Sequence, residues 1–464
     1  MSNKLGPLDL AFLAIEQPKN PMAVGLLQIY EIPENYEGNY TRDLYNKFMQ
    51  IEAGPPFNRR LSHTMAIQRP HWKVDENFDL EYHVRHAALP EPGSTQDLFD
   101  LVMRIHTRML DRQRPLWEFY VIEGLEGNRF ALYSKLHHAT IDGMRGMTLV
   151  RDCLNEDPKA PLKVFWEPMD YEAKQEYQRT SITRKIRKLK KKLQFQTALA
   201  KDLTHIITTQ QLKLFGLKPS NSPVPFTAPN TFFNTPIKGA RRLAVNSYRL
   251  QEIKTIAKES DSTINDIVLL ICARALQKYL EEKKELPKKA LYASIPVSVA
   301  NVNRPGNYIT YVAANLATDI KDLRDQFLKI KESIGYAKQE IQEVTPAAAI
   351  SFAVLGQSLL AVLSKLGITN LLPPPANLII SNVPGPKNTL YLGDAKMLAQ
   401  YPLSVLPEAQ ALNITIVSYT DSIDIALFVC RDTVPDVAKL SEYMDLSYKE
   451  LKQAEINLPP LEIK

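Results

Sequence analysis

A strand that ends in two adjacent histidines is the feature that most constrains this chain. Residues 129–136 favour an extended strand, His137–Gly143 (HHATIDG) follows at once, and a helical apolar pattern occupies 144–154. A strand, a short loop and a helix in succession indicate α/β architecture. Because side chains alternate along a strand, His138 shares the face of the strand's apolar residues, whereas His137 takes the opposite face.

The residues of this loop are suited to proton transfer. Imidazole has an unperturbed pKa near neutrality, so His138 at the end of an apolar face can take a proton and return it. Asp142 is close enough in sequence to fold back and fix the loop, and Gly143 leaves room where a substrate or backbone passes closely. The pattern predicts an acid–base site with His138 as the base and His137 in support.

The histidine pair has three other possible interpretations. In the first interpretation, the two histidines are adjacent at a strand end by coincidence, and Asp142 and Gly143 form an ordinary turn. A metal site would need a third His, Cys or acidic ligand at a telling spacing, and the sequence has none. A serine hydrolase would need a Gly-x-Ser-x-Gly elbow, which is also missing. The full seven-residue pattern favours catalysis without a metal.

Length and rhythm predict two domains and a linker. The chain has 464 residues, which exceeds one ordinary core. Residues 1–155 and 236–464 both show a mixed α/β rhythm, whereas 156–235 contains a charge run and ends in a proline-rich stretch. The expected strands are 24–30, 119–122, 129–136, 291–299, 308–317, 377–381, 412–418 and 423–429. The expected helices are 95–111, 144–154, 250–259, 267–280, 322–344, 347–366 and 437–454.

Composition suggests a cytoplasmic protein. Lys and Arg number 57 against 51 Asp and Glu, a mild excess of +6, and the three cysteines are far apart, as expected in a reducing compartment. The N-terminus lacks a basic start followed by a long apolar run, so no signal peptide is expected. The longest apolar region, 347–372, is broken by polar residues and is predicted to be a mostly buried helix.

A basic run lies inside the predicted linker. Arg184–Lys192 holds seven basic residues in nine, and Ile182, Ile186, Leu189 and Leu193 recur at helical spacing. A solvated face, an anionic lipid surface and a nucleic acid are the three possible environments for such a helix. No nucleic-acid module or aromatic interleaving accompanies the run. We therefore expect peripheral contact with a membrane or lipid inclusion and no nucleic-acid partner.

Two further motifs each have a structural and a functional interpretation. Pro115, Leu116 and Trp117 start a strand and fill the core, or support the wall of a substrate tunnel. Asn265 precedes an apolar helix and suits a capping role, with Asp266 favoured by the helix dipole. Contact with substrate is the alternative for both residues, and the two roles are compatible.

A rigid turn follows the predicted strand 377–381. Asn382–Pro386 (NVPGP) contains two prolines and one glycine, which leave the backbone little freedom. A turn of this kind either has a purely structural purpose or helps to shape a substrate channel, with Asn382 and Gly385 as the binding candidates.

The motif His-His-x-x-x-Asp-Gly resembles that of the CoA-dependent acyltransferase superfamily, which includes chloramphenicol acetyltransferase, carnitine acyltransferases and condensation domains. Within it, the chain is most similar to the bacterial wax ester synthase/diacylglycerol acyltransferase family. The additional matches occur in family order: Pro7-Leu8-Asp9, Pro21-Met22, Gly25, Pro115-Leu116-Trp117, Asn265-Asp266, Pro296-Val297-Ser298-Val299 and Asn382-Val383-Pro384-Gly385-Pro386.

This resemblance implies a fold and a reaction. It implies two chloramphenicol-acetyltransferase-like domains, each a mixed sheet flanked by helices, with a tunnel between them. A segment of the second domain crosses to the first in relatives, and 373–386 is the expected segment. His138 would deprotonate a fatty alcohol or diacylglycerol, whose oxygen attacks acyl-CoA directly to give wax esters or triacylglycerol. Acyl-CoA is a co-substrate, and no metal or prosthetic group is implied.

Two rival functions remain at this point. A condensation-type acyltransferase would use carrier-bound thioesters, but no carrier protein is fused to the chain. A non-catalytic lipid-surface protein would have kept the fold and lost the activity. The intact His138 and Asp142 weigh against the second rival.

Overall fold

The computed structural model describes residues 5–63, 70–140, 143–168, 199–218, 222–298, 309–366 and 372–454. Asp142 and Arg184–Lys192, both singled out from the sequence, lie outside these ranges.

The first of two large sheets carries the histidine motif. Its strand order is β11-β12-β1-β6-β5-β4, with β4 parallel to β5 and the other neighbours antiparallel. The strands are β1 (Ala23–Glu31), β4 (Val84–Ala88), β5 (Trp117–Leu125), β6 (Arg129–His137), β11 (Tyr391–Leu392) and β12 (Ala395–Leu403). A separate ribbon pairs β2 (Arg59–Leu61) with β3 (Trp72–Val74). The predicted strands at 24–30, 119–122 and 129–136 are confirmed.

The first sheet is completed by a strand from the far end of the chain. This strand is β12, which pairs with β1: Gly25 of β1 lies opposite Leu403 of β12, and Gln28 lies opposite Gln400. A crossing segment is therefore present, but its predicted position at 373–386 is wrong. That range contains β10 (Leu378–Val383), which pairs with two strands of the second sheet.

The second sheet has the strand order β7-β14-β13-β10-β8-β9. Strand β10 is parallel to both β13 and β8, and the remaining neighbours are antiparallel, so this sheet is also mixed. Its other strands are β7 (Arg241–Arg249), β8 (Tyr292–Ser298), β9 (Ile309–Asn315), β13 (Leu412–Tyr419) and β14 (Ser422–Cys430). The five strands predicted after residue 290 are found where expected within a few residues.

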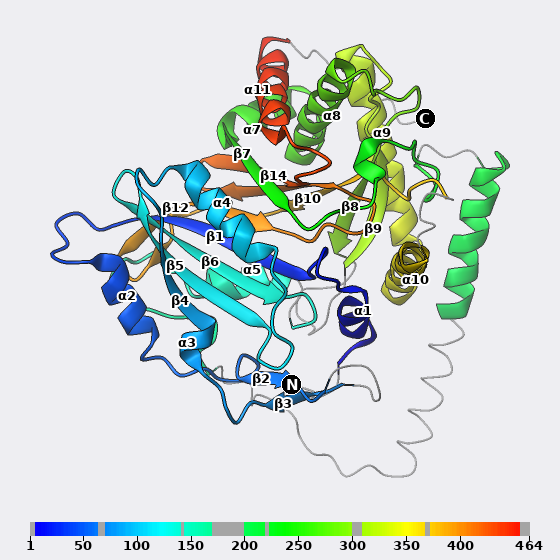
Figure 1. Ribbon diagram of the computed structural model, residues 1–464. Helices are drawn as coiled ribbons and strands as arrows, with labels where there is room; N and C mark the ends of the chain where they lie inside the picture. Colours follow the sequence, from blue (N-terminus) through cyan, green and yellow to red (C-terminus); the bar gives the residue numbers. More distant parts are fainter. Residues whose placement is uncertain are drawn as a thin grey trace.

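Helices flank both sheets, as Figure 1 shows. Those of the first half are α1 (Pro7–Ile15), α2 (Tyr40–Phe48), α3 (Leu80–His83), α4 (Thr95–His106) and α5 (Gly143–Asp152). Those of the second half are α7 (Leu250–Glu259), α8 (Ile264–Glu282), α9 (Leu323–Gln342), α10 (Pro346–Lys365) and α11 (Val437–Gln453). Residues 199–214 form a further helix, and 232–234 a short 3₁₀ turn. The predicted arrangement of two mixed sheets flanked by helices is confirmed.

One apolar cluster joins the two halves. Leu27 and Ile29 of β1 and Val102 of α4 belong to the same buried cluster as Leu243 of β7 and Phe428 of β14. Since burial of apolar surface is the main favourable term in folding, this shared cluster fixes the two sheets against each other. The histidine motif therefore has a rigid support on the side of the second half.

Helix α4 ends five residues before its predicted limit for an electrostatic reason. The ammonium group of Lys135 is fully buried and donates to the carbonyls of Ile105, at 2.8 Å, and of Arg108. The last carbonyls of a helix lack partners within the helix, and a cation satisfies them well. A lysine on β6 thus stops the helix, and no local signal near 106 reveals it.

Helix α10 differs from its predicted environment. Four of its apolar side chains, at spacings of four, three and four residues, are exposed: Leu355 by 59%, Leu359 by 42%, Val362 by 53% and the following Leu366 by 65%. The expectation of a mostly buried helix is wrong, because among the α10 side chains that the structure describes the buried ones are Ala348, Ala349 and Leu360. In the described part of the chain, no helix is long and apolar enough to cross a membrane.

Candidate active site

The two histidines lie at the C-terminal end of β6, the strand between β1 and β5. The amide of His137 donates to the Leu116 carbonyl at 3.0 Å, and the amide of His138 donates to the Met22 carbonyl at 2.8 Å. The two adjacent amides are thus hydrogen-bonded to different segments: Leu116 directly precedes β5, and Met22 directly precedes β1. The backbone positions of the two histidines are fixed by the sheet itself.

His137 is fully buried, with a hydrogen bond at one ring nitrogen and a carboxylate near the other. Its Nδ1 accepts the amide hydrogen of Ala139 at 3.0 Å, so the ring proton is assigned to Nε2. Nε2 lies 3.3 Å from Oε1 of Glu16, an electrostatic contact that is not straight enough to count as a good hydrogen bond. His137 therefore serves the structure of the loop.

Glu16 is a buried carboxylate with partners on both oxygens. Oε1 also accepts the Met22 amide at 3.0 Å, and Oε2 accepts two bonds from Arg112, at 2.9 and 3.2 Å. Burial alone would raise its pKa, but His137, the Met22 amide and Arg112 outweigh it and lower the pKa to about 2. Glu16 is therefore ionised at neutral pH.

His138 has a different environment. Its ring is stacked on Phe12 of α1, with centroids 4.0 Å apart and an interplanar angle of 17°. The side chain is half-buried as a whole, but Nδ1 is enclosed and has no hydrogen bond of good geometry among the described residues. Burial lowers its pKa to about 4; its own backbone carbonyl opposes this, and His137 adds to the lowering. His138 is therefore neutral at physiological pH.

The remainder of the predicted motif is only partly described. Gly143 is the first residue of α5, so the loop ends there. Asp142 lies outside the described residues, and its predicted role in fixing the loop stays a prediction.

Pro115, Leu116 and Trp117 lie in the interior. Trp117 is fully buried among aromatic rings and donates from Nε1 to the Phe57 carbonyl at 2.7 Å. Leu116 belongs to a small apolar cluster with Leu13 of α1. The triplet therefore packs the core directly beneath the histidine motif.

Asn265 does not cap α8, contrary to the capping interpretation. The N-cap is Thr263, whose hydroxyl accepts the Asp266 amide at 3.3 Å, while the Asp266 carboxylate accepts the Thr263 amide at 3.0 Å. This reciprocal pair is a capping box, which leaves the Asn265 side chain available for another contact. Its Oδ1 accepts a hydrogen bond from Nδ2 of Asn382 at 3.3 Å.

Asn382 lies near the end of β10, and Gly385 lies in the turn that follows it. Asn382 is exposed beside Asn265, so the structure brings together two of the predicted binding residues, in the second half of the chain. A Cβ atom at Gly385 would overlap the Ser418 carbonyl oxygen, and the Gly385 amide donates to the Ser418 hydroxyl at 3.1 Å. Gly385 is therefore required for the close approach of two backbones.

Sequence reasoning missed Phe12, Glu16 and Arg112. Glu16 had one local signal, because it is a lone carboxylate directly after an apolar helix and before the Pro21-Met22 element. Its partner Arg112 lies 96 residues later in the chain and its partner His137 lies 121 residues later, so no local pattern connects them. Gly25, one of the residues that match the family, lies in the same region. A side chain does not fit at this position, because a Cβ atom at Gly25 would overlap the Tyr133 hydroxyl.

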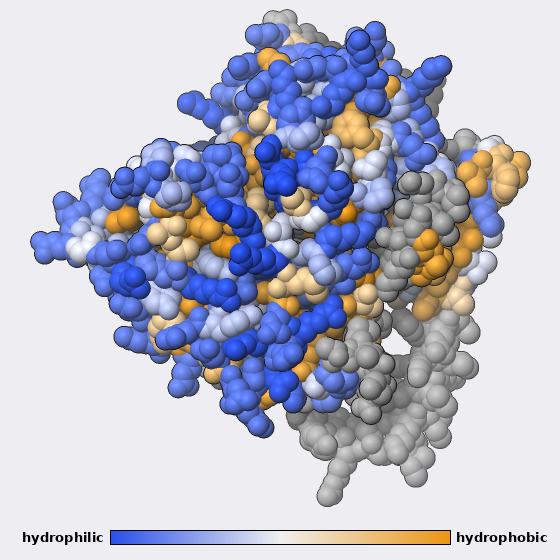
Figure 2. Space-filling model, in the orientation of Figure 1, coloured by the Kyte–Doolittle hydropathy of each residue, from blue (hydrophilic) through white to orange (hydrophobic). Residues whose placement is uncertain are grey.

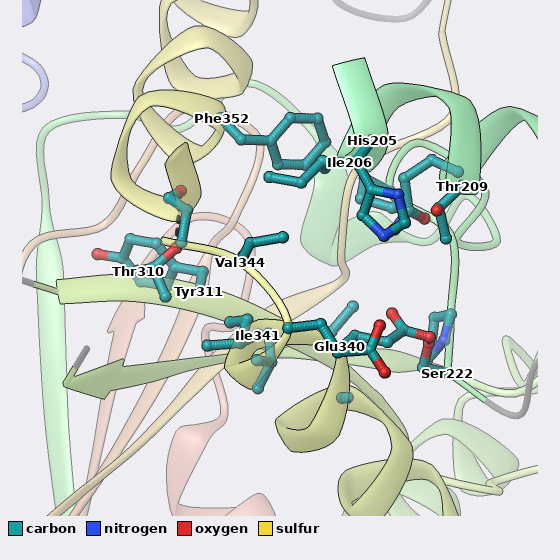
Figure 3. Close-up of a pocket in the computed structure, with 18 residues that line it drawn as sticks. His205, Ile206, Thr209, Ser222, Thr310, Tyr311, Glu340, Ile341, Val344 and Phe352 are labelled. Atoms are coloured by element: carbon teal, nitrogen blue, oxygen red, sulfur yellow. Dashed lines mark hydrogen bonds between the residues drawn. The ribbon is translucent and has the colours of Figure 1, made fainter. Parts of the chain in front are cut away.

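A cavity lies away from these residues, between the helix at 199–214, β9 and the junction of α9 and α10. Its volume is about 100 Å³. Figure 3 shows Ile206, Val344 and Phe352 on its apolar side and Glu340 near Ser222 on the other. Lys213 binds both Glu340 and Ser222, which anchors this part of the predicted linker to α9. None of the predicted site residues lines this cavity.

Comparison with family models identifies the chain. The model described as the wax ester synthase/diacylglycerol acyltransferase catalytic domain matches residues 5–268, and that of the WS/DGAT C-terminal domain matches 305–452. The chain belongs to the wax ester synthase/diacylglycerol acyltransferase family. The resemblance inferred from the sequence is thereby confirmed, and the protein is an O-acyltransferase of this family.

Individual relatives agree with this assignment over almost the whole chain. The O-acyltransferase WSD of Acinetobacter baylyi is 35% identical, covering 95% of each chain. A Mycobacterium tuberculosis protein named as a diacylglycerol O-acyltransferase is 36% identical, covering 97% of this chain and 99% of its own. The solved wax ester synthase/diacylglycerol acyltransferase of Marinobacter aquaeolei VT8 has a TM-score of 0.76 at 31% identity, covering 98% of this chain and 100% of its own.

The fold is shared more widely. The first condensation domain of the calcium-dependent antibiotic synthetase has a TM-score of 0.60 at 13% identity, covering 98% of this chain and 96% of its own. Similarity at this level concerns the fold alone.

Proposed function

We propose that this acyltransferase moves a long-chain acyl group from acyl-CoA to a fatty alcohol or a diacylglycerol, with His138 as the general base. The products are a wax ester or a triacylglycerol, and free coenzyme A. The observation that carries the proposal is a neutral, partly enclosed imidazole in a family whose members bear these activities in their names. A tunnel between the two halves would bring the substrates to this ring.

The reaction needs one proton carrier and no acyl-enzyme. His138 removes the hydroxyl proton while the acceptor oxygen attacks the thioester carbonyl, which forms a tetrahedral oxyanion. The oxyanion collapses, the carbon–sulfur bond breaks, and the leaving thiolate takes the proton back from the imidazolium. A positioned base of this kind contributes about 10²–10⁴-fold to the rate, and positioning of the substrates contributes further.

The environment of the ring favours one nitrogen as the base. Nδ1 is enclosed beside the backbone carbonyl of His138, an acceptor that suits a protonated Nδ1. Nε2 then carries the free electron pair. Asp142 is proposed to hold the loop, and Asn265 and Asn382 are proposed to contact the substrate from the second half.

An acceptor panel tests the proposal. Thiol release from palmitoyl-CoA would be followed with hexadecanol, with a diacylglycerol, with an amine and without acceptor. We expect release that depends on the alcohol or the diacylglycerol. Transfer only from a carrier-bound thioester would instead identify a condensation-type enzyme and contradict the proposal.

The acid limb of the pH profile provides a first prediction. The pKa of His138 is lowered, so the ring keeps its basic form as the pH falls. We expect kcat/KM to stay level from pH 8 to about pH 5 and to fall with an apparent pKa of about 4. An acid limb centred near 6.5, the ordinary value for histidine, would contradict this expectation.

The pH measurement needs a folding control. His83 and His106 are also buried with pKa values lowered by burial to about 4 and about 3, so the unfolded chain takes up protons before the folded one. Stability is therefore lost as the pH falls from about 6.5 toward 4. Tryptophan fluorescence recorded alongside each rate separates loss of the base from loss of the fold.

We also propose that the protein docks on an anionic lipid surface, because its substrates and products partition into lipid. The predicted contact through Arg184–Lys192 has a counterpart among the described residues. The exposed stripe of α10 is apolar, and Phe215 and Leu217, directly after the helix at 199–214, are exposed by 73% and 72%. Figure 2 shows hydrophobic groups gathered on that helix, which stands at the edge of the molecule.

The charge around these apolar groups suits an anionic surface. Lys201 in the first turn of the helix and Lys218 beyond its end are exposed, and the one acidic residue of the helix, Asp202, accepts a hydrogen bond from the Thr345 amide. Exposed apolar patches mark interaction surfaces, and each basic residue near an anionic membrane contributes about 1 kcal/mol.

Serine at Leu355, Leu359, Val362 and Leu366 should therefore weaken docking. We expect the fraction that floats with phosphatidylcholine/phosphatidylglycerol vesicles to fall about tenfold, with little change in turnover of a water-soluble alcohol. Replacing four of the seven basic residues of 184–192 by glutamine should act in the same direction. Flotation like that of the unmodified protein in both variants would count against lipid docking.

Serine at Val74 and Leu446 is the matched control for the α10 variant. These residues are similarly exposed, by 54% and 50%, but lie on β3 and α11. Their replacement should leave flotation unchanged.

A further inference from the structure

The C-terminal end of α1 contacts both histidines through residues four apart, Phe12 in the helix and Glu16 at its C-cap. Phe12 and Glu16 lie on the same side of the helix end, because residues i and i+4 are neighbours on a helix. Phe12 stacks on the ring of His138, while Glu16 approaches Nε2 of His137. One short helix therefore reaches the two adjacent imidazoles by two different kinds of contact.

Glu16 also controls the backbone that carries His138. Its Oε1 accepts the Met22 amide at 3.0 Å, and the Met22 carbonyl accepts the His138 amide at 2.8 Å. The same oxygen lies 3.3 Å from His137, whose Nδ1 accepts the next amide, that of Ala139. Glu16 is thus the common end of two chains of contacts that enclose His138 from both sides.

The position of Glu16 is itself fixed. Arg112 binds its second oxygen in two bonds and reaches the Leu13 carbonyl of α1 at 2.6 Å. The Glu16 side chain is only 1% exposed, so solvent has almost no access to the carboxylate. A charged hydrogen-bonded group in this setting holds its geometry more firmly than a neutral one.

We propose that Phe12 and Glu16 are positioning residues that hold His138 in the orientation needed for proton transfer. Glu16 fixes the backbone at His138 and the supporting ring of His137, and Phe12 fixes the plane of the His138 ring. The proposal rests on the proposed role of His138 as the base. The proposal also explains why residue 137 is a histidine: Nδ1 accepts a hydrogen bond from the Ala139 amide, while Nε2 faces the Glu16 carboxylate.

Helix α1 is well placed for this role. Its N-terminus is closed by the Asp9 carboxylate, which accepts the Gly6 amide at 2.8 Å, and the helix lies against α10 of the second half. Movement of α1 would therefore be resisted from both halves of the molecule.

Steady-state kinetics of Glu16→Gln and Phe12→Leu test the proposal. With palmitoyl-CoA and hexadecanol, each variant should lose about 10–100-fold in kcat, with KM for both substrates within about threefold, because misplacement of a catalytic group affects chemistry more than binding. Phe12→Tyr keeps an aromatic ring against His138 and should restore most of the kcat lost in Phe12→Leu. This rescue would remain informative if Glu16→Gln failed to fold.

Glu118→Gln is the matched control. Glu118 is another buried carboxylate of the same sheet, held by Arg85 at 3.4 Å and by the Tyr120 hydroxyl at 3.0 Å, and it contacts neither histidine in the described structure. It should destabilise the protein while leaving kcat near that of the unmodified enzyme. An equal loss of kcat in Glu118→Gln would overturn the positioning role, since general destabilisation would then explain all variants.

The same assays separate this inference from the function on which it rests. If His138→Ala abolishes turnover while Glu16→Gln and Phe12→Leu keep normal kcat, the base stands and the positioning role is overturned. If His138→Ala turns over normally, the proposed base itself is wrong.

Discussion

Replacing His138 by alanine should lower kcat/KM for palmitoyl-CoA and hexadecanol by about 10²–10⁴-fold. The variant loses the only proposed proton acceptor, while the backbone bonds that hold this position, His138 to Met22 and His137 to Leu116, are unaffected by the side chain. His138→Gln should be as inactive as the alanine variant, because an amide fills the space but takes up no proton. Thiol release followed at saturating donor measures the effect.

The control for His138→Ala is a histidine outside the site. His71 is exposed, and its replacement by alanine should leave both the rate and the melting temperature nearly unchanged. A His138→Ala variant that folds normally and keeps more than about a tenth of the rate would rule out general base catalysis by this ring.

Replacing Trp117 by alanine should lower the free energy of unfolding by about 3–5 kcal/mol. The indole is fully buried against Phe57, Phe165 and Trp166, and its N–H donates to the Phe57 carbonyl. The variant leaves both a large cavity and a buried carbonyl without its donor. Urea denaturation monitored by circular dichroism measures the loss.

Two comparisons separate the parts of that loss. Trp117→Phe keeps most of the ring and should cost less, about 1–3 kcal/mol, mainly through the unpaired Phe57 carbonyl. Leu446→Ala, at an exposed position, should change stability by about 0.5 kcal/mol or less. A Trp117→Ala variant with native stability and a selectively raised KM for one substrate would assign Trp117 to the substrate wall instead of the core.

Much of the fold followed from local patterns. Strands β1, β6 and β14 are short segments rich in apolar residues, and α8 and α11 repeat apolar residues at helical spacing, so each was predicted from its own residues. The crossing strand was not predicted. Ala395–Leu403 contains Pro402 and pairs with a partner about 370 residues earlier, and pairing over such a distance leaves no local trace.

The site was predictable where its chemistry is contiguous. His137 and His138 were found because seven adjacent residues carry the pattern, whereas the contacts of Phe12, Glu16 and Arg112 join residues far apart in the sequence. The capping interpretation of Asn265 was wrong for a simpler reason: Thr263, two residues earlier, forms the better cap with Asp266. The exposed stripe of α10 could not be told from a core stripe, since periodicity shows that residues share a face but not what covers it.

The crossing of β12 has a consequence for how the protein is made. Until residue 403 has left the ribosome, β1 lacks one of its two neighbours, and its unpaired backbone groups are open to association with other chains. Some 240 residues separate the end of α5 at Asp152 from the start of β12 at Ala395, and all of them are synthesised before the first sheet can be completed. Separating the two halves would leave the amino-terminal fragment with an open sheet edge at β1, so the first half needs the second half to complete its sheet.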